Sequence, residues 1–121
     1  MSHSEIDHLL PLTPAVFYIL LALADQERHG YGIMQEVTAM TQSKTLMGPG
    51  TLYGSIKRML QTNLIEESEE RPDPEIDDER RRYYRLTAFG RQVLSAEAQR
   101  LSALVHVAQT KNILGGAEVG Q

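Results

Sequence analysis

Apolar side chains fill every position from 15 to 24, the most continuous hydrophobic run in the chain. Thr13 and Pro14 stand directly before this run, and they suit the N-cap and the first position of a helix. The pattern therefore predicts a helix from Pro14 to about Asp25. Because no face of this helix is polar, we expect it to be covered on nearly all sides, in part by a second subunit.

Two further helices are predicted, one over residues 31–40 and one from Thr51 to Asn63. Each has apolar residues on one side only, at the spacing of an amphipathic helix. These apolar sides consist of Ile33, Met34 and Val37, and of Leu52, Ile56, Met59 and Leu60. Asn63 tolerates the left-handed conformation that ends many helices, and Leu64 would then contact Met59. The first half of the chain therefore predicts a core of three helices.

The second half predicts a β-hairpin and a long terminal helix. Strands are expected at about 65–70 and 80–86, separated by a loop rich in proline and acidic residues, and Thr87 is expected to cap a helix over 88–112. The predicted fold is mainly α with a small β-hairpin, a winged helix-turn-helix followed by a C-terminal dimerisation helix. The expected organisation is an N-terminal arm (1–11), the winged helix-turn-helix domain (12–87), the dimerisation helix (88–112) and a flexible tail (113–121).

Composition limits the classes of function. The 121 residues contain no cysteine, which excludes disulfides, thiolate metal sites and cysteine nucleophiles. The longest apolar run is about half the length needed to span a bilayer. No basic residue precedes Arg28, whereas Glu5 and Asp7 are acidic, so a signal peptide is not expected. We expect a cytoplasmic protein with no membrane partner, metal or cofactor.

The formal charge of −4 is unevenly distributed along the chain. Residues 66–79 hold nine of the sixteen acidic residues and one of the twelve basic residues. The remaining chain has eleven basic and seven acidic residues, a balance of +4. A mildly basic body that carries one acidic segment is compatible with nucleic-acid binding, although the total charge is not.

The helix predicted from Thr51 has a polar side that carries no acid. At about 100° per residue, the side opposite the apolar stripe carries Gly54, Lys57, Arg58 and Gln61, with Thr51 and Ser55 beside it. Arginine and glutamine bind base edges in the major groove, and lysine binds phosphate. The alternative is an ordinary solvated face.

Four arginines mark the second predicted strand. Arg81 and Arg85 would lie on one face, and Arg82 would lie on the other with Tyr84. A basic strand beside a recognition helix is suited to phosphate contacts, which position a protein on DNA. Alternatively, these arginines neutralise the acids of residues 66–79 across the hairpin.

Three stretches of the chain resemble the PadR family of transcription regulators. They are "LTPAVFYILLALADQERHGYGIMQEV", "GPGTLYGSIKRMLQTNLIEE" and "RRRYYRLTAFGRQVL", and together they cover about Leu12 to Leu94. The resemblance implies major-groove contacts from Thr51, Tyr53, Gly54, Lys57 and Arg58, wing contacts from Arg81 and Arg82, and phosphate contacts near His29, Gly30 and Tyr31. For Tyr31 and Tyr53, core packing is the alternative. The wing loop is longer and more acidic than the Gly-rich turn usual in the family, which puts a contact from the wing tip in doubt.

The apolar side of the last helix is wider than one neighbouring helix needs. It consists of Phe89, Val93, Leu94, Ala98, Leu101, Leu104, Val105 and Ala108. Two-fold pairing of two subunits would cover it and would present two recognition helices to a palindromic operator. The expected interface residues are Phe17, Leu20, Leu94, Leu101, Leu104, Val105 and Ala108. A stripe covered within one subunit is the alternative. Glu97 and Arg100, at i and i+3, are expected to pair.

The resemblance further implies a short PadR regulator, a repressor that responds to a small aromatic effector. The chain has no tryptophan, so stacking on an aromatic effector would require Phe17 or Tyr18, and the effector stays unidentified. The partners expected are double-stranded DNA and a second copy of the chain.

The two alternatives to DNA binding are an enzyme and a protein-docking module. The four histidines, His3, His8, His29 and His106, are scattered, and no metal pair, phosphate loop or nucleophile with a base is present. We therefore expect no enzyme activity. A winged-helix module that docks a protein through its acidic hairpin is the closer alternative.

Overall fold

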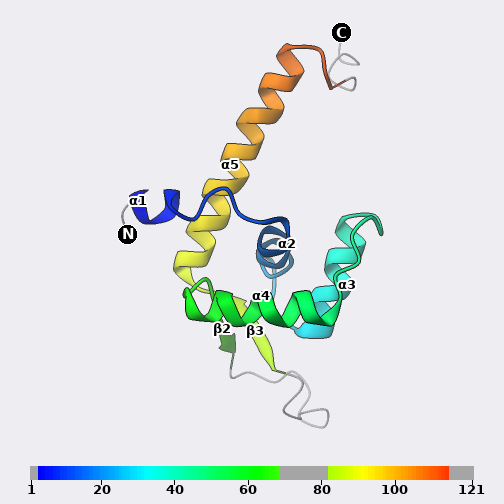
Figure 1. The fold of residues 1–121 in the computed structure, drawn as a ribbon, viewed down its shortest axis with the longest axis vertical. Coiled ribbons are helices and arrows are strands. Elements are labelled where there is room, and N and C mark those ends of the chain that lie inside the picture. The colour runs from blue at the N-terminus through cyan, green and yellow to red at the C-terminus, as the bar shows by residue number, and fades with distance from the viewer. Residues whose placement is uncertain (1–2, 69–81, 115–121) are drawn as a thin grey trace.

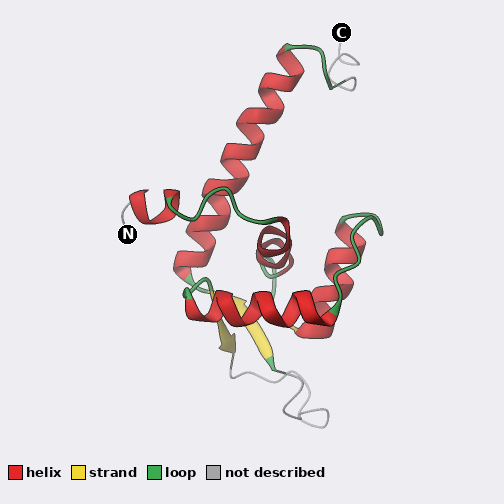
Figure 2. Cartoon of the chain, in the orientation of Figure 1, coloured by secondary structure: helices red, strands yellow, loops and turns green. Residues whose placement is uncertain are grey.

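The structure is a computed structural model that describes residues 3–68 and 82–114. It contains helices at both ends of the described chain and a small sheet between them (Figures 1 and 2). The elements in chain order are α1 (His3–Asp7), α2 (Pro14–Ala22), β1 (Arg28–His29), α3 (Gly30–Met40), α4 (Pro49–Gln61), β2 (Ile65–Ser68), β3 (Tyr83–Leu86) and α5 (Ala88–Thr110). The predicted fold class, mainly α with a small β-hairpin, is confirmed.

Helix α2 lies at the centre of the subunit, where it contacts α3, α4 and α5 (Figure 1). As predicted, Thr13 is its N-cap, and the Thr13 hydroxyl accepts a hydrogen bond from the Val16 amide at 3.3 Å. The helix ends at Ala22, three residues before the predicted end. Two arginine side chains donate to carbonyls there: Arg28 to Ala22 at 2.7 Å and Arg91 to Ala24 at 3.2 Å.

The subunit itself covers part of α2. Ile19, Leu20, Ala22 and Leu23 are all buried among residues of the same chain. The other apolar residues of α2, Ala15 to Tyr18 and Leu21, are only partly buried by their own chain, so the expectation that a second subunit completes the cover stays a prediction. The sequence shows that a helix is apolar on every side, but it does not show how many neighbours its own chain supplies.

Helix α4 begins two residues before the predicted start. Gly48 is its N-cap and Pro49 occupies the first turn, where the missing N–H of proline costs nothing. The predicted end is confirmed. Asn63 has a φ of 65°, and the Leu64 amide donates to the Met59 carbonyl at 2.9 Å. This is the Schellman arrangement, which satisfies carbonyls that a helix end leaves unpaired.

The sheet contains one strand more than the sequence predicted. β2 and β3 form the expected antiparallel hairpin, with Ile65 opposite Leu86 and Ser68 opposite Tyr83. The two residues of β1 pair with the other edge of β3, which gives the order β1-β3-β2. The sequence predicted no strand in this segment, because two residues show no periodicity. The predicted residues 69–70 and 80–81 of the hairpin, and the acidic loop between them, lie outside the described residues.

The first turn of α5 is held against the turn between α4 and β2 by hydrogen bonds and close packing. The Thr87 hydroxyl accepts from the Gly90 amide at 2.8 Å and donates to the Asn63 carbonyl at 2.6 Å. A Cβ at Gly90 would collide with the Leu64 carbonyl group, so only glycine fits at this crossing. Val93 and Leu94 join the core, whereas the second half of α5 extends away from the other elements (Figure 1).

Candidate nucleic-acid interface

The outer side of α4 is polar and cationic, as predicted. Leu52, Ile56 and Met59 are buried, whereas Lys57 and Arg58 are exposed. Thr51 and Gln61 are exposed too, and Gly54 is partly buried. Helix α4 contains no acidic residue, and neither cation pairs with a carboxylate among the described residues. This exposed side, formed by Thr51, Tyr53, Gly54, Lys57 and Arg58, is called the α4 face below.

Ser55 does not belong to the α4 face. Its side chain is fully buried, because it follows Leu52 by three residues and precedes Met59 by four, which places all three on the inner side. The Ser55 hydroxyl is an acceptor for Arg58 at 3.5 Å. The prediction that Ser55 is available to DNA is therefore wrong.

Tyr31 and Tyr53 lie at the surface near the starts of α3 and α4. The exposed fraction is 61 % for Tyr31 and 44 % for Tyr53. Neither is a core residue, so the alternative of core packing does not hold for them. The Tyr53 ring lies against Gly30, a contact that no local sequence pattern predicts.

His29 connects the sheet to α3. Its Nδ1 accepts a hydrogen bond from the Gly32 amide at 3.0 Å, which makes it the N-cap of α3. Nδ1 is an acceptor here, so the ring proton is assigned to Nε2. The ring packs edge-on against Tyr83, with 5.3 Å between the ring centres. His29 therefore has a structural role at this junction, which the sequence analysis missed.

The arginines of the wing strand pair with glutamates across the hairpin. Arg82 lies 3.0 Å from Glu67, and Arg85 lies 2.9 Å from Glu66. The predicted neutralisation of wing arginines by acids is therefore confirmed for these two. All four side chains are about half exposed, and such pairs are weakly held. Arg81 lies outside the described residues.

Tyr84 is the buried aromatic residue of the wing. Its burial raises the pKa of the phenol above the ordinary value, and the nearby Glu67 carboxylate and Tyr53 add to this rise. The Tyr84 hydroxyl therefore stays protonated at neutral pH.

Apolar side chains line the second half of α5 without cover from the rest of the subunit. Leu104 is 54 % exposed, and Val105 is about half exposed. The other predicted interface residues differ: Leu101, Ala108 and Phe17 are partly buried, whereas Leu20 and Leu94 are buried in the core of their own subunit. Those last two are therefore not free for an interface. The exposed apolar residues that the prediction missed are Val107, Ile113 and Leu114.

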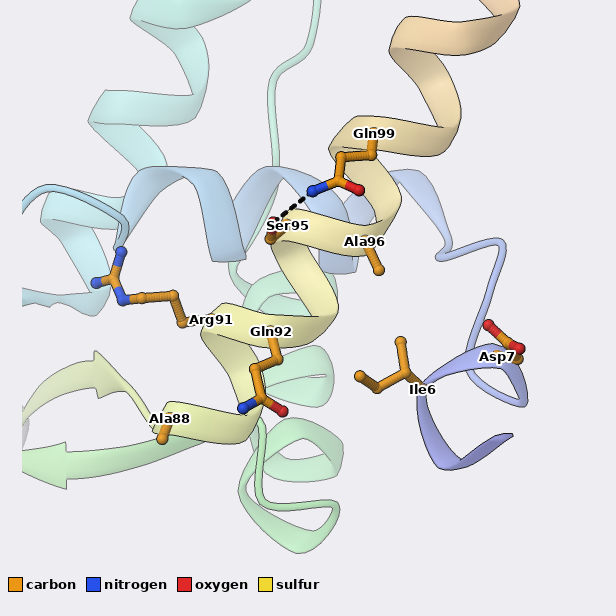
Figure 3. Close-up of a pocket in the computed structure, with 8 residues that line it drawn as sticks. All are labelled: Ile6, Asp7, Ala88, Arg91, Gln92, Ser95, Ala96 and Gln99. Atoms are coloured by element: carbon orange, nitrogen blue, oxygen red, sulfur yellow. Dashed lines mark hydrogen bonds between the residues drawn. The ribbon is translucent and has the colours of Figure 1, made fainter. Parts of the chain in front are cut away.

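A groove of about 650 Å³ separates α1 from the first half of α5 (Figure 3). Ile6 and Asp7 line one side, and α5 lines the other through Ala88, Arg91, Gln92, Ser95, Ala96 and Gln99. Phe17 and Tyr18, the aromatic residues considered for an effector, do not line it; their rings lie 6.4 Å apart and are tilted by 46°.

Residues 3–68 and 82–114 contain neither a metal-binding cluster nor a membrane-spanning helix. Within these ranges no three histidine or acidic side chains are grouped as a metal ion would require. No helix in the same ranges is long and apolar enough to cross a bilayer.

Three helices, a three-stranded wing and an exposed cationic side on the third helix of the core define a winged helix-turn-helix protein. The profile of the transcriptional regulator PadR-like family matches residues 19–96, and the chain belongs to this family. The family consists of DNA-binding transcription regulators and not of enzymes, so the expected resemblance and the expected lack of enzyme activity are both confirmed.

One relative of similar length is named a transcriptional regulator. The chain is 33% identical over 99 residues to a transcriptional regulator of Mycobacterium tuberculosis, covering 82% of this chain and 81% of that protein. It is also 33% identical over 90 residues to an uncharacterized transposon protein of Streptomyces fradiae, but it spans only 24% of that relative's length.

Solved structures show the same fold. A PadR family transcription regulator of Clostridium difficile superposes with a TM-score of 0.65 at 26% identity, covering 81% of this chain and 97% of that one. A PadR-like regulator of Bacillus cereus superposes with a TM-score of 0.65 at 19% identity, covering 88% and 94%.

Proposed function

We propose that this regulator binds a palindromic operator as a homodimer and inserts the α4 face into the major groove. The observation that carries the proposal is the α4 face itself, because its two cations are exposed and face no acid in α4. Arg58 is suited to a base edge and Lys57 to a phosphate. The first turn of α3, with His29 and Tyr31, would lie near the DNA backbone.

The wing is proposed to contact phosphates through Arg82, together with Arg81. In the free protein Arg82 is paired with Glu67, at the surface. An exposed pair contributes at most about 1 kcal/mol, so a phosphate is able to replace the carboxylate at little cost. The wing would therefore add to affinity and contribute little to sequence specificity.

The second half of α5 is proposed to form the dimer. The exposed Leu104, Val105 and Val107 give this segment an apolar surface that the subunit leaves uncovered. Two-fold pairing would bury it and would place two α4 faces about one DNA turn apart. Repression, and release by a small aromatic effector, are part of the proposal as expectations from the family.

Removing the two cations of the α4 face tests the DNA-binding proposal. Fluorescence anisotropy with the upstream region of the protein's own gene, measured at several salt concentrations, should show tight binding by the wild type. The double variant Lys57→Ala with Arg58→Ala should lose specific binding. The slope of the logarithm of the binding constant against the logarithm of the salt concentration should become less steep by up to about 3.6. Each of the four cations that the dimer loses contributes about 0.9 to this slope.

The matched control is Lys44→Ala with Lys111→Ala. These side chains are exposed and lie outside α4, and the control changes the net charge by the same amount. Because Lys111 is the C-cap of α5, this control is first checked by light scattering to remain dimeric, and it should then retain operator affinity. Equal losses in both double variants would mean that charge alone, and not the α4 face, governs binding. A wild-type dimer that binds no DNA at low salt would instead favour protein docking through the acidic hairpin.

The dimer is tested separately by Leu104→Glu with Val105→Glu. Light scattering coupled to gel filtration should show a monomer, and operator affinity should fall because only one half-site is then bound. Gln99→Glu, at an exposed polar position of α5, should remain dimeric. A wild-type monomer, or a dimeric double variant, would refute the proposed interface.

A further inference from the structure

Gly30, the first residue of α3, is buried, and its backbone conformation does not require glycine. No glycine in the described ranges has a positive φ, so alanine is compatible with the backbone at this position. Alanine is also the better helix former. The reason for glycine here must therefore lie in what packs against it.

The side chain of Tyr53 occupies the space that a side chain at residue 30 would need. A Cβ built on Gly30 would lie 2.8 Å from Cζ and 3.0 Å from Cε1 of Tyr53, and it would overlap the hydroxyl oxygen. Because Tyr53 is 44 % exposed, the ring rests on Gly30 with part of its surface open to solvent. The ring is thus seated on the backbone of α3.

This contact lies where the helices meet the wing. Gly30 directly follows His29, which pairs with Tyr83 in the sheet, and the phenol of Tyr53 is close enough to Tyr84 to affect its ionisation. Tyr53 itself belongs to α4, beside the cations of the α4 face. Tyr53 therefore connects α4 to the end of α3 that adjoins the sheet.

We propose that Gly30 is a positioning residue for DNA recognition. Because Gly30 has no side chain, the ring of Tyr53 packs directly on it, and this contact holds the Tyr53 hydroxyl in one direction on the α4 face. The inference rests on the proposed function, because it assumes that this face meets DNA. An exposed tyrosine without such a seat would sample several rotamers, and holding it would cost binding free energy. Gly30 would thus determine specificity without contacting DNA.

The variant Gly30→Ala should displace the ring and leave the fold intact. The atoms that meet the new Cβ belong to the outer end of a partly exposed side chain, which has solvent to turn into. Affinity for the operator should fall on the order of tenfold, the loss of about one specific contact, whereas affinity for an unrelated duplex should stay the same. A merely structural defect would lower both affinities together.

Gly32→Ala is the matched control. It adds the same methyl group in the same helix turn, where the nearest neighbours of a Cβ lie at 3.5–3.6 Å, an ordinary contact distance. This variant should keep the wild-type ratio of operator affinity to unrelated-duplex affinity, because a disturbed phosphate contact in this turn would lower both affinities together.

A double-mutant cycle with Tyr53→Ala completes the test. With Tyr53 removed, adding Gly30→Ala should cause no further loss of operator affinity, because no ring is left to displace. Should Gly30→Ala fail to fold, the Tyr53→Ala background should restore folding. Three outcomes would overturn the inference. Gly30→Ala could cause equal losses of operator affinity in both backgrounds, or it could bind the operator as Gly32→Ala does. It could also misfold without being rescued by Tyr53→Ala. Wild-type protein that binds no DNA would refute the proposed function, and this inference with it.

Discussion

The replacement Glu97→Gln should destabilise the subunit at neutral pH, and much less so in acid. Glu97 is only 2 % exposed, yet it is charged. Its carboxylate accepts from the Leu12 amide at 2.9 Å and from Arg100 at 2.6 and 3.1 Å. Glutamine has the same shape but no charge and only one acceptor atom, so it leaves at least one of these donors poorly paired.

The expected size follows from these contacts. Hydrogen bonds to a charged group contribute about 1.5–3 kcal/mol, so we expect the free energy of unfolding to fall by about 2 kcal/mol at pH 7. The hydrogen bonds from Arg100 lower the pKa of Glu97 below its ordinary value of 4.5, and the bond from Leu12 adds to this against the opposing effect of burial. The stabilisation is therefore complete above about pH 4.5 and disappears as the pH falls through the lower folded-state pKa.

Urea denaturation followed by circular dichroism at pH 7 and below pH 4.5 would measure the difference between wild type and Glu97→Gln. The control is Glu67→Gln, which removes a carboxylate that is about half exposed, and its effect should stay below about 1 kcal/mol. An undiminished difference in acid would refute the reasoning, because it would show that shape and not charge stabilises this site. An unaffected stability at pH 7 would refute it as well.

Three further predictions concern the turn between α4 and β2 and the wing. Gly90→Ala should lower the free energy of unfolding by about 2 kcal/mol or more in urea denaturation, because its Cβ would collide with the Leu64 carbonyl; a stable variant would mean that α5 shifts freely. Asn63→Ala should cost about 1 kcal/mol and Asn63→Gly nothing, since the residue has a φ of 65°; equal stabilities would contradict this. Glu66→Gln removes the carboxylate that pairs with Arg85, which would let Arg85 bind a phosphate. Fluorescence anisotropy with an unrelated duplex should then show a salt dependence of binding that is steeper by up to about 0.9 per subunit. An unchanged salt dependence would show that the wing lies away from phosphate.

The features predicted best are those fixed by neighbouring residues. The N-caps Thr13 and Thr87 and the helix end at Asn63 depend on side chains within a few positions, and the structure confirms all three. The Glu97 pair with Arg100, at i and i+3, was predicted for the same reason and is present.

The features missed depend on contacts between distant segments. β1 exists because β3 offers it a free edge, and nothing in its two residues signals this. Leu20 was assigned to an interface because the sequence does not show which chain covers an apolar helix. The bond from the Leu12 amide to Glu97 spans 85 positions and has no local signature.

The candidate site was predicted in the same uneven way. The α4 face follows from helical spacing, so the positions of Lys57 and Arg58 were correct. Ser55 was misplaced because its hydroxyl was grouped with the polar residues, although its spacing to Leu52 and Met59 places it on the inner side. The seat of Tyr53 on Gly30 joins two helices, and spacing within either helix gives no indication of it.

The two residues of β1 have a mechanical consequence for regulation. They belong to the connection between α2 and α3, and they are also an edge of the wing sheet. The wing sheet should therefore move together with the helices, and each subunit of the proposed dimer should move as a rigid body. An effector that releases such a dimer from its operator would have to change the distance or angle between the two subunits. That rigid-body motion would take place about α5.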